Sequence, residues 1–160
     1  LGLVCPVVLE AKQIMQRLWK ARIDWDESIS ATESAKWEKW KAKLSELASV
    51  EIPRCSRMYL SRTTNAVKIT LHLFSDPSES GYGMCSYLRF LHVDGTVHRV
   101  FLIGKSQTCP LKPISIPRLE LQAAALSVKV YKVIKEELTY SIAQTFFWTD
   151  SQTTLQYIRN

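Results

Sequence analysis

The sequence predicts a mixed α/β domain, with parallel and antiparallel strands in one sheet, preceded by a mostly helical segment. Before residue 50 the apolar residues recur at helical spacing, whereas from Val67 they alternate with polar residues, as in β-strands. A long apolar helix then separates the first strands from a later one. A strand reached across a helix is normally parallel to the strand that it joins, so the sheet should be mixed.

The first fifty residues predict two helices. One spans about residues 7–22, with Pro6 suited to its first turn. After a polar break the second begins near Thr32 and ends near Ser49. Its apolar stripe includes Trp37 and Trp40, which could form a packing face against another domain or a platform for stacking bases. Residues 50–66 are polar and irregular in pattern.

Three strands joined by hairpins should follow. Their alternating patterns cover about residues 67–73, 84–93 and 97–104. A Pro/Ser/Gly cluster separates the first two, and Asp94-Gly95 is typical of a two-residue hairpin between the second and third. Cys85, within the second strand, is expected in the core.

The remaining elements are a helix, a strand and a helix. Pro117 opens a helix that runs to about Leu138 and is apolar on more than one face, so we expect it to be largely buried. A short apolar strand covers residues 145–148, and another helix begins at Ser151. The domain division expected from the change of period is therefore 1–66 and 67–160.

The positive charge is spread along the chain. The net charge is +6, with +3 in residues 1–66 and +3 in residues 67–160. Such a chain suits a polyanion such as nucleic acid, although a solvated basic surface is an equally ordinary explanation. Lys105 and Arg118 could contact phosphate or could simply be exposed basic residues.

The cysteines and the chain ends indicate an intracellular fragment. Four scattered cysteines give neither zinc-ligand spacing nor a disulfide framework, which favours a reduced, cytoplasmic setting. No leader and no apolar run of about 18 residues is present, so no membrane association is expected. The chain starts at Leu1 without a methionine and ends within a helical pattern, so we expect a piece of a longer protein.

Three carboxylates have distinctive positions. Asp76 follows the first strand, Glu120 lies in the first turns of the apolar helix, and Asp150 follows the last strand. In a parallel α/β arrangement these could converge and bind Mg²⁺ or Mn²⁺, which prefer oxygen ligands. Each also has an ordinary alternative: Asp76 can start a turn, Glu120 can complement the helix dipole, and Asp150 can cap the next helix.

Several motifs resemble the RNase H domain of retroelement polyproteins, and that of BEL/Pao elements in particular. These motifs are Phe74-Ser75-Asp76-Pro77-Ser78 with Gly81-Tyr82-Gly83, Gly104-Lys105-Ser106, Pro110-Leu111-Lys112, the stretch from Ile116 to Ala124, and Trp148-Thr149-Asp150-Ser151 with Leu155-Gln156-Tyr157-Ile158. Upstream, Leu1 to Pro6, Ala11-Lys12, Leu18-Trp19 and Asp24-Trp25-Asp26 are similar to the stretch that follows the polymerase core in the same elements.

The resemblance implies an RNase H-like fold behind the tail of a reverse transcriptase. By that resemblance Asp76, Glu120 and Asp150 occupy three of four metal-binding acidic positions, and the fourth lies beyond Asn160 with the last strand and closing helix. The implied reaction is Mg²⁺- or Mn²⁺-dependent hydrolysis of RNA in an RNA/DNA hybrid, within a Pol polyprotein, in the cytoplasm or inside virus-like particles. Recognition would use backbone shape and 2′-hydroxyls.

Two departures from the family pattern matter. Pro77 stands where the family usually has a small residue, and proline removes an N–H from the loop that carries Asp76. The domain is also incomplete. Alternatives are therefore a catalytically inactive nucleic-acid-binding or connection module from a decayed element, or a host protein that recruited this region. Peptidase activity is not expected, because no Asp-Thr/Ser-Gly loop occurs and no local motif marks a nucleophile.

Overall fold

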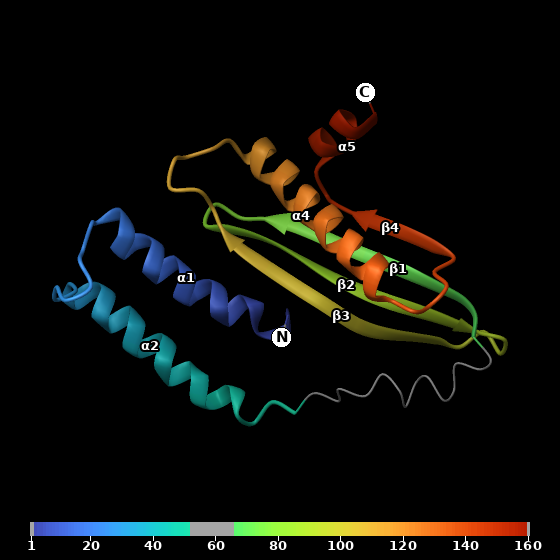
Figure 1. Cartoon of the computed structure of the whole chain (residues 1–160), viewed down its shortest axis with the longest axis horizontal. Helices are drawn as coiled ribbons and strands as arrows, with labels where there is room; N and C mark the ends of the chain where they lie inside the picture. The colour runs from blue at the N-terminus through green and yellow to red at the C-terminus, as the bar shows by residue number, and fades with distance from the viewer. Residues whose placement is uncertain (1, 52–65, 160) are drawn as a thin grey trace.

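The computed structural model describes residues 2–51 and 66–159, as one sheet with helices around it (Figure 1). In chain order the elements are a short 3-10 helix Gly2–Val4, α1 (Cys5–Lys20), α2 (Ala31–Leu47), β1 (Ala66–Pro77), β2 (Gly81–His92), β3 (Val97–Thr108), α4 (Ile116–Glu137), β4 (Gln144–Trp148) and α5 (Gln152–Arg159). Among these, no helix is both long and apolar enough to cross a bilayer. The irregular stretch expected at 50–66 falls mostly outside the described residues.

The four strands form one mixed sheet in the order β3-β2-β1-β4. The β1–β2 and β2–β3 pairs are antiparallel, whereas β1 and β4 run parallel, from Thr70 opposite Gln144 to Phe74 opposite Trp148. The helix α4 connects β3 to β4, and this connection crosses the sheet so that β4 lies beside β1 and parallel to it. The predicted mixed α/β class is therefore confirmed.

One face of the sheet packs against α4, which lies across it (Figure 1). The buried core comprises Leu71 and Leu73 of β1, Met84, Leu88 and Phe90 of β2, and Leu126, Val130 and Ile134 of α4. The expectation that α4 would be largely buried is wrong, since its other face is exposed, with Val128 at 44 % and Val133 at 54 %. A single sheet can cover only one stripe of a helix.

The first two strands are longer than predicted. β1 continues through Asp76 and Pro77, which pair with Gly83 and Tyr82 of β2. The Pro/Ser/Gly cluster was expected to be a loop, but Gly81 belongs to the sheet. Only residues 78–80 connect the strands, because the Ser78 hydroxyl closes the turn by donating to the Gly81 carbonyl at 2.8 Å. The turn is thus made by serine, and Asp76 does not start it.

The hairpin between β2 and β3 is also longer than the two residues predicted. Four residues separate His92 from Val97, and the Thr96 carbonyl accepts from the His92 N–H at 3.0 Å. Gly95 has a φ of 82°, a left-handed conformation in which glycine is not strained. The Asp94 carboxylate accepts from both the N–H and the hydroxyl of Thr96, which fixes the turn.

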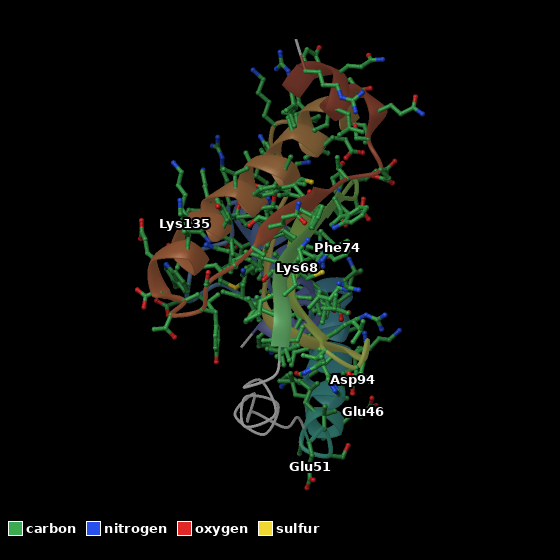
Figure 2. The ribbon with its side chains drawn as sticks, turned by 90° about the vertical axis from the view of Figure 1, so that its right-hand side faces the viewer. Glu46, Glu51, Lys68, Phe74, Asp94 and Lys135 are labelled. Carbon is green, nitrogen blue, oxygen red and sulfur yellow. The ribbon has the colours of Figure 1, made fainter. Side chains whose placement is uncertain are left out.

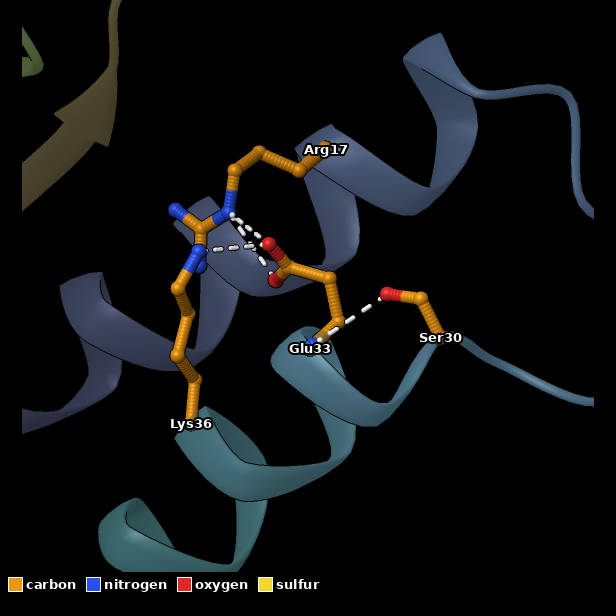
Figure 3. Close-up of polar contacts among 4 residues, drawn as sticks. All are labelled: Arg17, Ser30, Glu33 and Lys36. Atoms are coloured by element: carbon orange, nitrogen blue, oxygen red, sulfur yellow. Dashed lines mark hydrogen bonds and ion pairs between the residues drawn. The ribbon is translucent and has the colours of Figure 1, made fainter.

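The N-terminal helices form an antiparallel pair, and an ion pair joins the end of α1 to the start of α2. Figure 3 shows Glu33 accepting hydrogen bonds from Arg17 of α1, at 3.0 Å, and from Lys36, at 2.6 Å. Ser30 caps α2 by accepting from the Glu33 N–H. Trp37 and Trp40 stack 4.7 Å apart, and the indole of Trp40 donates to the Val7 carbonyl. Trp40 therefore packs against α1 of the same chain, whereas the sequence had predicted a packing face against another domain.

The same α1 contacts the outer strand β3 (Figure 1). Lys12 Nζ donates to the Ser106 carbonyl oxygen at 3.1 Å, and the Ser106 hydroxyl donates to the Cys5 carbonyl oxygen at 3.1 Å. Close backbone contact is possible because the segment crosses at Gly104, where a Cβ would lie 2.8 Å from the Gly2 oxygen. The helical segment is thus attached to the sheet, while its division from the sheet near residue 66 stays a prediction.

Candidate active site at the ends of β1 and β4

The parallel pairing of β1 and β4 places Asp76 beside Asp150. The last paired residues are Phe74 and Trp148, and each aspartate stands two residues further along its strand direction. Neighbouring strands are about 4.8 Å apart, and side chains two residues apart share a face. The two carboxylates therefore come to one end of the sheet from adjacent strands.

Both aspartates line one pocket of about 550 Å³. Its other lining residues are Phe74, Ser75, Gly83, Met84, Cys85, Trp148 and Thr149. Both aspartates are exposed, and the ion pairs among the described residues include neither of their carboxylates. The pocket thus combines two exposed carboxylates with aromatic walls.

Glu120 approaches the same strand ends from α4. It is half-buried, and its Oε2 has no hydrogen-bond partner in the described part of the chain. Burial raises the pKa of the Glu120 carboxyl above its usual value, and the charges of Asp150 and then Asp76 raise it further. Glu120 does not line the pocket that holds the aspartates, although it is close enough for their charges to affect it.

The ordinary alternatives predicted for Asp150, a helix cap, and for Glu120, a partner of the helix dipole, do not fit the structure. Asp150 does not cap α5, because the Ser151 hydroxyl accepts the capping hydrogen bond from the Thr154 N–H at 3.2 Å. Glu120 lies beyond the first turn of α4, and a helix dipole that stabilised its charge would lower its pKa instead of raising it. Neither carboxylate therefore has an evident structural role.

A hard divalent cation fits this donor set in its chemistry. Carboxylate oxygens suit Mg²⁺ or Mn²⁺, and a buried oxygen without a partner beside two like charges is the environment that a cation would relieve. Nevertheless, no three His, Cys, Asp or Glu residues within 2–51 and 66–159 are close enough to form a metal-binding group. The carboxylates are electrostatically coupled but do not form a closed ligand shell.

The prediction of a core position for Cys85 is wrong, because this half-buried residue lines the carboxylate pocket. Burial raises the pKa of its thiol, so it is protonated at neutral pH and a poor nucleophile. Cys5 and Cys109 are also free thiols, and Cys55 lies outside the described residues. The sequence indicated neither Cys85 nor Trp148 as pocket residues. The period of two along the strands could have shown that both side chains lie on the same face of the sheet as Phe74.

A second pocket of about 410 Å³ adjoins the first. The two share Asp76, Gly83, Met84 and Cys85, and the second extends to Lys105 and to the N-terminal segment around Pro6. Of the two basic residues predicted as phosphate contacts, Lys105 therefore lies near Asp76. Arg118 is exposed on α4 and lines neither pocket.

Comparison with known proteins gives one family. The sequence model described as "Pao retrotransposon-like RNaseH-like domain" matches residues 1–151. The match includes Asp76, Glu120 and Asp150, and it spans both the helical segment and the sheet. No curated protein matches the chain.

Proposed function

The chain belongs to the Pao retrotransposon-like RNase H-like family, and from this premise we propose that it serves metal-dependent hydrolysis of RNA in RNA/DNA hybrids. The observation that carries the proposal is the placement of Asp76 and Asp150 in one pocket with Glu120 coupled to both. The reaction is proposed for the Pol polyprotein of which this chain is a piece, with residues 1–66 as the tail of its reverse transcriptase.

Asp76, Asp150 and Glu120 would hold the Mg²⁺ or Mn²⁺. When bound, such an ion lowers the pKa of a water molecule and stabilises the charge that develops on a phosphodiester. Asp76 and Asp150 are exposed and present oxygens to the pocket, whereas the half-buried Glu120 is held by α4. The rigid parallel pair β1–β4 fixes the aspartates relative to each other, which reduces the reorganisation needed on binding.

The hybrid would be recognised through its backbone. Recognition by shape uses contacts to phosphates and 2′-hydroxyls, and it does not use contacts to the base edges that carry the sequence. A net charge of +6 favours binding of such a polyanion. We therefore propose the RNA/DNA hybrid as the substrate and the remainder of the polyprotein as the protein context.

The direct test is cleavage of a labelled RNA/DNA hybrid by the full chain in Mg²⁺ or Mn²⁺. We expect Asp150→Asn and Asp76→Asn to lose at least about a hundredfold in rate, because neutral amides bind hard cations poorly. The matched control is Glu136→Gln, at an exposed position on the far end of α4. Cleavage that persists in Asp150→Asn, or that needs no divalent ion, would refute the proposed mechanism.

A non-catalytic nucleic-acid-binding or connection module is the second candidate. It is favoured by one observation, the absence of a closed three-ligand group in the described residues. Hybrid binding without cleavage, unchanged in Asp150→Asn and in the presence of Mn²⁺, would support this candidate over the nuclease.

A further inference from the structure

The sheet face opposite α4 is aromatic, and within the described residues α1 and the segment before it cover this face at the end of β3, at Gly104 and Ser106. Phe74 lies on this face, on the side away from Lys135 of α4 (Figure 2). Side chains that alternate along the strands put His72, Phe146 and Trp148 on the same face, where their rings stack 5.0 to 6.2 Å apart. Phe74, Phe146 and Trp148 remain 41 %, 37 % and 48 % exposed.

Two arginines stand directly opposite each other on this face. Arg89 of β2 pairs with Arg99 of β3 in the antiparallel register. Like charges opposite each other on neighbouring strands are destabilising unless something neutralises them. The ion pairs within the described residues use Glu10, Glu33 and Glu38, and none involves either arginine. The two guanidinium groups therefore form an uncompensated positive site.

The arginines line a pocket of about 280 Å³ together with His72, Phe74 and Tyr87. No carboxylate is among these lining residues. His72 is held as a wall of the pocket: its Nδ1 accepts from the Trp148 indole at 3.1 Å, and its Nε2 bonds to the Thr70 hydroxyl. Burial and then the charge of Arg89 lower the pKa of His72, so the imidazole is neutral at pH 7. The binding groups are thus the two planar, permanently charged guanidinium forks.

We propose that Arg89 and Arg99 bind a backbone phosphate of the nucleic acid. Guanidinium groups match the oxygens of a phosphate in geometry and charge, and two of them can bind one phosphate together. No carboxylate among the described residues lines the pocket to compete for them. The ring of Phe74 lines both this pocket and the carboxylate pocket, so one bound strand could span the two. This inference rests on the proposed hybrid substrate. It adds a second contact with the hybrid, beside the one at the carboxylate pocket.

The register gives the distance between the two contacts. Arg89 lies opposite Thr70 in the β1–β2 pair, six residues before Asp76. At about 3.3 Å per strand residue this is roughly 20 Å, or about six base pairs along a duplex. The phosphate bound by the arginines should therefore lie about six base pairs from the carboxylates.

The first experiment measures hybrid binding by fluorescence anisotropy in EDTA, where cleavage cannot contribute. We expect Arg89→Gln/Arg99→Gln to weaken binding roughly tenfold and to reduce the slope of log K against log salt by about 1. Lys135→Gln, on the opposite side of the molecule, should change neither. Unaltered affinity and slope in the double variant would overturn the phosphate site, whatever the outcome of the cleavage assay.

Hybrid length and protein stability supply independent tests. In Mg²⁺, the difference in cleavage rate between wild type and the double variant should disappear on hybrids in which the cleaved phosphate lies less than about six base pairs from the end that faces the arginines. An equal difference on those hybrids would contradict the spacing. Because two like charges are removed, Arg99→Gln should not lower the melting temperature. A lower melting temperature would show that Arg99 stabilises the fold itself. Preferential binding of a polyglutamate peptide over the hybrid would assign the arginines to an acidic protein partner, and either result would overturn the proposal.

Discussion

At the scale of single residues, Glu120 has the most informative environment. A carboxyl oxygen buried without a partner costs stability when it is charged, and two neighbouring aspartates increase that cost. A protein selected for stability alone would not keep such a cost, which supports the proposal that Glu120 serves the metal site. The same reasoning predicts how stability depends on pH.

Glu120→Gln should stabilise the protein at neutral pH. The pKa of Glu120 is raised in the folded state, so the unfolded chain releases this proton more readily. The raised pKa adds to the free energy of unfolding below the unfolded pKa of about 4.5, where Glu120 is protonated. This contribution is lost as the pH rises through the pKa of the folded state. At pH 7 we expect a higher melting temperature for Glu120→Gln than for wild type, by a few degrees, and little difference near pH 4.

Thermal unfolding followed by circular dichroism from pH 4 to 8 measures this difference. Glu136→Gln is the matched control, since the residue is an exposed glutamate on the same helix. A lower melting temperature for Glu120→Gln at pH 7 would mean that the carboxylate stabilises the fold, which contradicts the reasoning above.

At the scale of elements, the helix α4 supplies three of the eight buried core residues in the described part of the chain, Leu126, Val130 and Ile134, and also carries Glu120. Its buried stripe, from Leu119 to Ile134, packs on β1 and β2. Each fully buried apolar side chain contributes about 1.5–3 kcal/mol. The position of Glu120 therefore depends on packing further along the same helix.

Leu126→Ala should destabilise the domain by about 2–5 kcal/mol, because it leaves a cavity between α4 and the sheet. Val128→Ala, two residues further along on the exposed face, should cost less than about 0.5 kcal/mol. Urea unfolding of both variants measures the two costs. Equal losses would show that the outer face of α4 is also packed in solution.

At the scale of the whole molecule, the helical segment and the sheet meet at β3. The contact joins α1 to the outer strand through Lys12 and Ser106, and the backbones touch at Gly2 and Gly104. An outer strand covered in this way is protected from pairing with another chain. The contact also extends the second pocket toward the N-terminal segment.

Gly104→Ala should loosen this attachment, because the added Cβ would lie 2.8 Å from the Gly2 oxygen. We expect a loss of about 1–3 kcal/mol and faster proteolysis within residues 2–20. Lys105→Ala, at the adjacent exposed position, serves as the control. Unchanged proteolysis of Gly104→Ala would show that the helical segment is not held at this point.

Local patterns in the sequence were sufficient for the order of elements and the family. The period of two identified β1, β2 and β3, the apolar helix implied the parallel partner β4, and the motifs around Asp76 and Asp150 indicated the RNase H-like family that the comparison confirms. Element ends were less certain, because Pro77 and the glycines at 81 and 83 carry turn signals that strand pairing overrides.

The sequence by itself determined the type and order of the strands and helices and which carboxylates lie near their ends, because side-chain period and turn chemistry are local properties. Only the tertiary structure decided that Asp76 and Asp150 share a pocket, that Glu120 adjoins it with a buried oxygen, and that Arg89 faces Arg99. These relations depend on strand register and on which face α4 covers. Register and packing are set by contacts between residues far apart in the chain, which no local pattern specifies.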